Sequence, residues 1–221
     1  TDNAKASTEV ATHMVESLGD AGQVVVIAHD SKSLTSQERV NNFIAEIQNN
    51  HPNMSVAGPY YMDQIDDIKK TIAEQQLDIV PVEGQELDEE QQTALDDAIA
   101  QITDEDIYNY ILEMNPDVKG IFATNGDTTM QALTACEGKD MKDVVIMGYD
   151  ADQEEIDAMK DGRIAGMIVQ NPYGMGYATV VAEARCVLNM GNEANVNTGY
   201  TWVTPDNIED RTVQDILYAE K

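Results

Sequence analysis

Residues 144–172, VVIMGYDADQEEIDAMKDGRIAGMIVQNP, indicate how this chain folds. They begin with an apolar run, residues 144–147, which is too short for a buried helix and typical of a buried parallel strand. Gly148 and Tyr149 follow, so that Asp150 stands just past the carboxyl end of this strand. Because ligands bind at the carboxyl ends of strands in open α/β sheets, Asp150 is a candidate ligand-binding residue.

A helix and a second strand complete the same stretch. Ile156 and Met159 mark the inner face of a helix that ends at Gly162. Residues 164–169 then form a second strand, which is followed by Gln170 and broken at Pro172. Two strands therefore present Asp150 and Gln170 to one edge of a sheet. Our hypothesis is that the chain binds a small polar molecule there and carries out no reaction on it.

The rest of the chain also alternates strands with helices. Predicted strands cover residues 23–28, 54–61, 118–124 and 199–203, and predicted helices cover residues 4–18, 36–50, 88–102, 107–116, 128–136, 173–190 and 207–218. This alternation predicts an α/β fold in which a Rossmann-like open parallel sheet with right-handed crossovers is flanked by helices.

Composition excludes several classes of protein. The chain has 221 residues, 41 of them Asp or Glu and 13 Lys or Arg, and its formal charge of −28 argues against direct binding of nucleic acid or of an anionic membrane. No run approaches the roughly 18 apolar residues of a membrane span. Cys136 and Cys186 lie in apolar helical patterns and are predicted to be buried packing thiols, because their spacing suits neither a disulfide framework nor a metal site.

The middle of the chain is unusually acidic. Between Lys70 and Lys119 there is no Lys or Arg, and we predict an acidic, partly helical insertion over about residues 74–102, followed by a capping box at residues 103–106. A calcium site is the alternative, but no stretch matches an EF-hand loop, and residues 150–152 lack its glycine and its terminal Glu. A solvated acidic face is favoured, and neither a metal nor a cofactor is expected.

Short motifs along the chain resemble those of one family. They are Thr1-Asp2-Asn3; Ser36-Gln37-Glu38-Arg39 with Phe43; Asn115-Pro116-Asp117-Val118 leading to Ile121-Phe122-Ala123-Thr124-Asn125; Val145-Ile146-Met147-Gly148-Tyr149-Asp150; Lys160-Asp161-Gly162; and Gln170-Asn171-Pro172 followed by Gly174-Met175-Gly176. Outside the acidic insertion, their order and spacing resemble the C-terminal half of a type I periplasmic sugar-binding protein, the ribose- and galactose-binding group of ABC-transporter receptors. The resemblance runs from Thr1 to about Asn207 and implies one lobe of a two-lobed fold.

The resemblance implies a set of ligand-binding positions in this lobe. They are Arg39, Asn125, Asp150 and Gln170, with an aromatic wall at Tyr60 or Tyr61. Sugar hydroxyls both donate and accept hydrogen bonds, which suits guanidinium, carboxylate and amide groups, while an aromatic ring can cover the apolar face of a sugar. Because side chains alternate along a strand, only one of the two tyrosines can face the ligand. Taken singly, the polar residues also suit surface ion pairs, turns or caps.

The resemblance also divides the chain into parts. It assigns residues 1–170 to the C-terminal ligand-binding lobe with its insertion, residues 171–200 to a helix and connection that belong to the N-terminal lobe, and residues 201–221 to the last hinge strand and a C-terminal tail. The N-terminal lobe has no counterpart in this sequence. The apolar face of the helix at residues 173–190 is therefore expected to need a cover: that lobe, a second chain or a swapped copy.

The implied function is that of the substrate-binding component of an ABC-type sugar transporter. Such a protein holds a mono- or small saccharide non-covalently between two lobes, works outside the cytoplasm in the periplasm or as a cell-surface lipoprotein, and docks on a membrane permease. The alternative is the effector-binding core of a LacI-type transcription regulator or of a sugar-sensing receptor. An enzyme is not expected, because His13, His29 and His51 have no Ser, Cys or acid at motif spacing and there is no Gly-rich phosphate loop.

Overall fold

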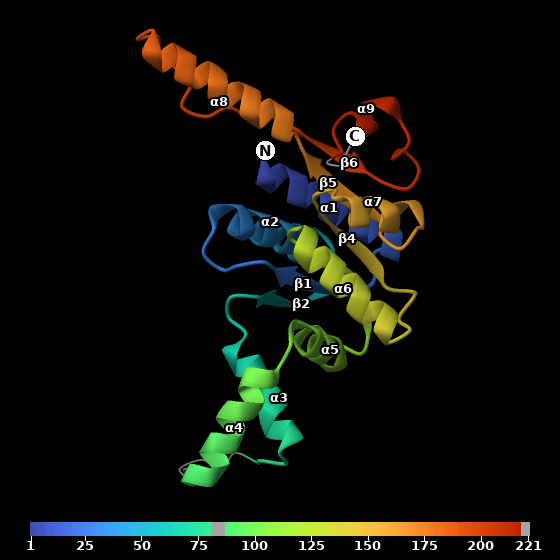
Figure 1. Cartoon of the computed structure of the whole chain (residues 1–221). Coiled ribbons are helices and arrows are strands. Elements are labelled where there is room, and N and C mark those ends of the chain that lie inside the picture. Colours follow the sequence, from blue (N-terminus) through green and yellow to red (C-terminus); the bar gives the residue numbers. More distant parts are fainter. Residues whose placement is uncertain (81–86, 218–221) are drawn as a thin grey trace.

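The computed structural model describes residues 1–80 and 87–217, and its centre is a six-stranded sheet (Figure 1). The strands are β1 (Gly22–Ala28), β2 (Met54–Tyr61), β3 (Val118–Ala123), β4 (Val145–Tyr149), β5 (Gly166–Gln170) and β6 (Tyr200–Val203), in the order β2-β1-β3-β4-β5-β6. Strands β1 to β5 are parallel, and only the edge strand β6 runs antiparallel to its neighbour β5. The predicted Rossmann-like open parallel sheet is confirmed.

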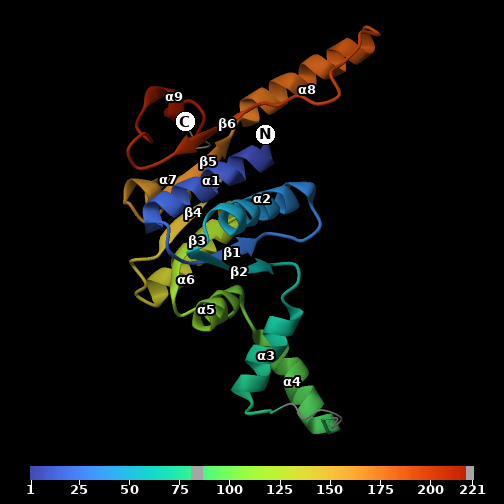
Figure 2. The same ribbon diagram turned by 180° about the vertical axis from the view of Figure 1, so that it is seen from behind.

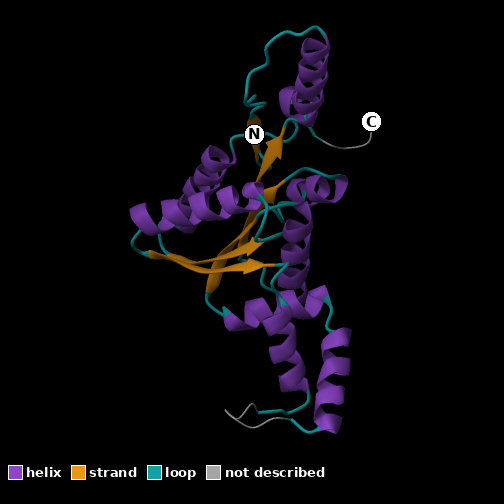
Figure 3. Ribbon diagram, turned by 90° about the vertical axis from the view of Figure 1, so that its left-hand side faces the viewer, coloured by secondary structure: helices purple, strands orange, loops and turns teal. Residues whose placement is uncertain are grey.

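Helices cover both faces of the sheet (Figures 1 and 3). One face carries α1 (Asn3–Leu18) and α2 (Leu34–Asn50), and the other carries α5 (Asp104–Met114), α6 (Gly126–Gly138) and α7 (Gln153–Lys160). The central strand β1 contributes alternate residues to the two resulting cores, since Val25 and Ile27 pack toward α5 and α6 while Val24 and Val26 pack toward α1 and α2. A strand buried on both faces explains the uninterrupted apolar run in the sequence.

The acidic insertion forms a projecting arm at the β2 edge of the sheet (Figures 2 and 3). We call the arm residues 66–101; it contains α3 (Asp66–Gln76) and α4 (Glu89–Gln101), and residues 81–86 lie outside the described part. Its α4 corresponds to the helix predicted at residues 88–102, whereas α3 was not predicted. The capping box at the end of the arm is confirmed: the Thr103 hydroxyl accepts from the Asp106 amide at 3.3 Å, and the Asp106 carboxylate accepts from the Thr103 amide at 2.9 Å.

Helix α8 (Pro172–Val187) extends away from the body beyond β5 and β6 (Figures 1 and 2). None of its residues is buried within the described structure, and Tyr173 and Val187 are each 82% exposed. The prediction of two buried thiols is therefore right for Cys136 and wrong for Cys186, which is exposed. The apolar pattern around Cys186 is that of a packed helix, but among the described residues only the loop after α8 contacts this thiol, through Asn192 Nδ2 at 3.1 Å.

The C-terminal segment is less helical than predicted. In place of a helix over residues 207–218, the structure has a single short helix, α9 (Arg211–Gln214), and its description ends at residue 217. The Asn207 side chain accepts from the Thr204 amide at 2.9 Å and donates to the Trp202 carbonyl at 3.1 Å. These bonds close a turn after β6, because Asn readily replaces backbone hydrogen bonds in turns.

A buried carboxyl group supports the carboxyl ends of β3 and β4. Glu155 in the first turn of α7 is 1% exposed, and a Cβ added at Gly126 would lie 3.1 Å from its Oε2. Its Oε2 accepts from the Asp152 amide at 3.0 Å, but its Oε1 has no partner in the described structure. Burial raises the pKa of Glu155 to about 8; the nearby carboxylates of Asp150, Asp152 and Asp127 add to the rise, and the Asp152 amide opposes it.

This carboxyl should make the stability of the fold depend on pH. In the unfolded chain it ionises near its ordinary pKa of 4.5, while the folded protein keeps it protonated up to about pH 8. The free energy of unfolding should therefore fall as the pH rises through that window, by an amount on the order of a few kcal/mol, and the Glu155→Gln variant should lose this part of the dependence. Urea denaturation of both proteins from about pH 5 to about pH 9 measures the difference.

The matched control is Glu154→Gln, which removes an exposed carboxyl from the preceding position of the same helix. Its pH dependence should follow that of the wild type. Parallel curves for wild type and Glu155→Gln would show that this carboxyl ionises alike in the folded and unfolded chains.

Candidate functional site

The candidate site lies at the carboxyl ends of the central strands, which we call the mouth of the sheet. Asn125 follows β3, Asp150 follows β4 and Gln170 ends β5, and these three strands are neighbours in the sheet. Arg39 reaches the same edge from α2. The topology thus brings four residues together that lie up to 131 positions apart in the sequence (39 to 170).

Arg39 is held on three sides and is only 5% exposed. Its Nε donates to Asn3 Oδ1 at 3.1 Å, its Nη1 donates to the Thr124 carbonyl at 2.5 Å, and its guanidinium lies 3.9 Å from the centre of the Tyr149 ring. The Tyr149 hydroxyl is in turn hydrogen-bonded to Ser7 at 2.8 Å. A buried cation needs such partners, because an unpaired one costs several kcal/mol. Arg39 therefore links α1, α2, β3 and β4 at the mouth.

Asn125 and Asp150 are fixed to the same loop after β3. The Asn125 Oδ1 caps α6 by accepting from the Thr128 amide at 3.1 Å and from its hydroxyl at 2.7 Å. The Asp150 Oδ2 accepts from the Gly126 amide at 3.0 Å. Within the described structure, Asn125 Nδ2 and Asp150 Oδ1 make no hydrogen bond, so the two N–H groups of this amide and one carboxylate oxygen remain for a ligand.

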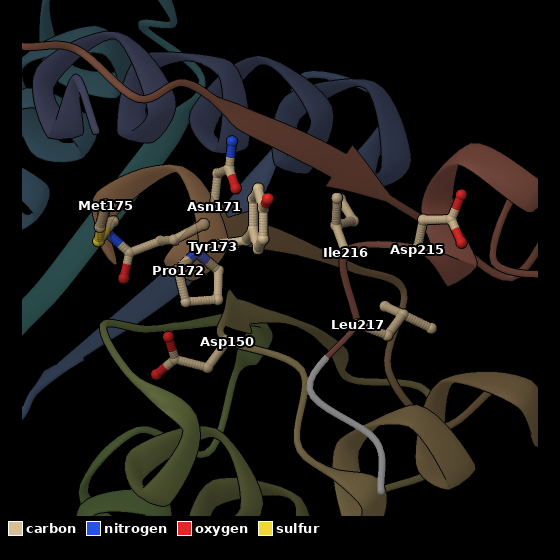
Figure 4. Close-up of a pocket in the computed structure, with 9 residues that line it drawn as sticks. Asp150, Asn171, Pro172, Tyr173, Met175, Asp215, Ile216 and Leu217 are labelled. Carbon is tan, nitrogen blue, oxygen red and sulfur yellow. The ribbon is translucent and has the colours of Figure 1, made fainter. Parts of the chain in front are cut away.

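Gln170 shares a cleft with Asp150 but not with the other two residues. The cleft has a volume of about 530 Å³, and its further lining comes from the start of α8 and from the C-terminal segment (Figure 4). Gln170 Nε2 donates to the Thr1 hydroxyl at 2.9 Å, which ties the end of β5 to the start of the chain. Its side-chain oxygen is without a partner among the described residues and is available as an acceptor.

The two tyrosines at the end of β2 lie on opposite faces of the sheet, as strand alternation predicts. The Tyr60 hydroxyl accepts from Asn115 Nδ2 at 2.9 Å, and Asn115 precedes β3, at the opposite end of that strand from Asn125. Tyr61 packs against the core formed with α1 and α2. Among the described residues, neither tyrosine lines the cleft that Asp150 and Gln170 share.

His29 also belongs to the mouth, although the sequence predicted neither a catalytic nor a ligand-binding role for it. It follows β1, and both its amide and its ring Nδ1 are hydrogen-bonded to the Thr124 hydroxyl, at 3.0 and 2.7 Å. Burial lowers the pKa of His29, and the positive charge of Arg39 adds to the effect. A neutral imidazole carries one donor and one acceptor, which suits a hydroxyl-bearing ligand. Its position directly after a strand is the signal that could have identified it.

Residues 1–80 and 87–217 contain neither a metal-binding cluster nor a membrane-spanning helix. No group of three or more His, Cys, Asp or Glu side chains there could hold a metal ion. None of the helices in these ranges combines the length and the apolarity needed to cross a bilayer.

Comparison with known proteins identifies the family. Residues 1–186 match the family described as "Periplasmic binding protein domain". The chain is 35% identical over 66 residues to the ribose import binding protein RbsB of Salmonella typhimurium, an alignment that covers 30% of this chain and 22% of the relative. It is 31% identical over 86 residues to RbsB of Haemophilus influenzae, covering 39% of this chain and 29% of that protein.

Solved structures show the same fold. An ABC transporter solute binding protein from Agrobacterium vitis with bound D-fucose superimposes with a TM-score of 0.75 at 24% identity, covering 99% of this chain and 63% of that one. A carbohydrate transporter solute binding protein from Agrobacterium radiobacter in complex with D-arabinose superimposes with a TM-score of 0.74 at 23% identity. This match covers 98% of this chain and 64% of that one. The chain thus spans less than two thirds of these structures. Because the family match extends over 186 of its 221 residues, the chain belongs to the periplasmic binding protein domain family.

Proposed function

We propose that this chain is the C-terminal ligand-binding lobe of the substrate-binding component of an ABC-type sugar transporter. It binds a mono- or small saccharide non-covalently and carries out no reaction on it. The observation that supports this most strongly is the grouping of Arg39, Asn125 and Asp150 around residues 124–126. Asn125 Nδ2 and Asp150 Oδ1 in this group make no hydrogen bond to a described residue.

The chemistry of the mouth suits sugar hydroxyls. Each hydroxyl can donate to the Asp150 carboxylate and accept from the Asn125 amide, and hydrogen bonds that involve a charged partner are about twice as strong as neutral ones. Gln170 extends the same pattern along the cleft, and we keep it in the proposed ligand set. We keep Tyr60 and Tyr61 as the proposed aromatic wall, which requires that β2 and the loop after it move when ligand binds. In the present structure the Tyr60 hydroxyl is bonded to Asn115 and Tyr61 packs against the core formed with α1 and α2.

The relatives favour transport over gene regulation. The curated relatives are import binding proteins for ribose, and the solved structures hold D-fucose and D-arabinose. We therefore prefer a transport receptor to the core of a LacI-type regulator or of a sensor. On this proposal the protein acts outside the cytoplasm, in the periplasm or as a cell-surface lipoprotein, and delivers its sugar to a membrane permease.

The exposed helix α8 supports a second lobe. Its apolar residues Tyr177, Val180 and Val187 are 65%, 65% and 82% exposed, a pattern that a globular chain normally covers. We propose that residues 171–200 pack on an N-terminal lobe, that residues 1–170 form the ligand-binding lobe described here, and that residues 201–221 contain the last hinge crossing. Sugar would then be enclosed between the two lobes.

Asp150→Asn should weaken sugar binding by roughly 10- to 100-fold, because the variant replaces a charged acceptor with a neutral one while keeping an oxygen for the Gly126 amide. Isothermal titration of the full-length gene product with D-ribose, D-galactose, D-arabinose and D-fucose measures the effect. The control is Asp143→Asn, an exposed carboxylate without a described hydrogen bond or ion pair. Equal affinities of Asp150→Asn and wild type would contradict the proposed role of this carboxylate.

The 221-residue chain by itself should bind these sugars weakly or not at all, because half of the enclosing contacts are contributed by the second lobe. Titration of the isolated chain with the same four sugars tests this. Micromolar or tighter binding by the isolated chain would show that the mouth is sufficient and that no second lobe is required.

A further inference from the structure

A second cleft adjoins the proposed sugar site. It has a volume of about 420 Å³, and its lining includes Asn125, the amide that we assign to the sugar, and His29. The remaining wall comes from the start of α5 and the first turns of α6, where Asp104, Asp127 and Gln131 are exposed. Asn125 is therefore common to the mouth and to this cleft.

A largely buried tyrosine presents its hydroxyl to this cleft. Tyr108 is 3% exposed and lines the cleft, yet its hydroxyl makes no hydrogen bond to any described residue. Burial raises the pKa of Tyr108, and the carboxylates of Asp104 and Asp127 raise it further, so the hydroxyl keeps its proton and can donate it. Because the hydroxyl is open to the cleft, a water or a ligand there can accept its hydrogen bond.

The cleft lies at the base of the acidic arm, and no described residue of the arm itself lines it. Met62 lies just before the arm leaves the body, and Asp104 lies just after the arm returns to it. The capping box between Thr103 and Asp106 fixes the first turn of α5 and with it the position of Asp104.

We propose that the cleft binds a second sugar unit, so that the full ligand is a disaccharide whose first ring occupies the mouth. This inference rests on the proposed sugar-binding function and extends it. Hydroxyls of the second ring accept from Tyr108 and from the Asn125 amide, and donate to Asp104 and Asp127. Because a hydroxyl both donates and accepts, one kind of ligand group can pair with the donors of Tyr108 and Asn125 and with the carboxylate acceptors beside them.

Isothermal titration of the full-length gene product with paired sugars tests the proposal. The pairs are D-galactose with lactose and melibiose, D-glucose with maltose and cellobiose, and D-xylose with xylobiose. One disaccharide should bind at least about tenfold more tightly than its own monosaccharide, which corresponds to about 1.4 kcal/mol. Tyr108→Phe should weaken the binding of this disaccharide roughly three- to tenfold and leave the affinity for its monosaccharide unchanged.

The matched control is Tyr110→Phe, a partly buried tyrosine of the same helix that does not line the cleft. It should bind both sugars as the wild type does. Tyr108→Phe removes a hydroxyl that hydrogen-bonds to no described residue and is open to the cleft, so its melting temperature should stay close to that of the wild type.

The outcomes separate the two proposals. Monosaccharide binding without any gain from a disaccharide, or an equal loss of both affinities in Tyr108→Phe, overturns the second subsite and leaves the sugar-binding function intact. Tighter binding of D-glucosamine than of any disaccharide also overturns it, because the two carboxylates would then be selecting an amine. Failure of every saccharide to bind overturns the sugar-binding function together with the subsite.

Discussion

The buried guanidinium of Arg39 is the contact on which the arrangement of the mouth depends. It holds the Thr124 carbonyl, the Asn3 side chain and the face of Tyr149, and so joins two helices to two strands at a single point. Charges are rarely buried unless their partners are complete. The loop after β3 is therefore anchored on one side by Arg39 and on the other by the Asp150 carboxylate, which accepts from the Gly126 amide.

This anchoring explains how one lobe can be prepared for a ligand before the ligand arrives. The groups left open at the mouth, Asn125 Nδ2 and Asp150 Oδ1, belong to side chains whose other polar atom already has a partner. Binding then orders few additional torsions, which reduces the entropic cost of association. His29 fits the same design, because its two bonds to Thr124 fix the imidazole beside the loop. The buried carboxyl of Glu155 packs against Gly126 and so supports this loop from the interior of the protein.

Much of this could be predicted from the sequence because the strongest signals are local. The apolar runs of β1 and β4 and the polar residues directly after β3, β4 and β5 identified the sheet and its functional edge. The environment of Tyr60 could not be predicted, because its partner Asn115 comes from an element 55 residues away. Cys186 was misjudged for a different reason: periodicity shows that a helix has an apolar face but not whether anything in the chain covers that face. Tyr108 likewise has an ordinary core position in the pattern of α5, and only the fold shows that its hydroxyl opens into a cleft.

A crystal structure of the full-length gene product with its bound sugar is the most direct test of the central claim, that the mouth of this sheet is a sugar-binding site. The account predicts a sugar whose hydroxyl oxygens lie about 2.5–3.2 Å from Asp150 Oδ1 and Asn125 Nδ2, with the loop at residues 124–126 in the position seen here. A sugar bound without contact to Asp150 and Asn125, or a mouth that remains filled only with water at saturating sugar, would contradict it.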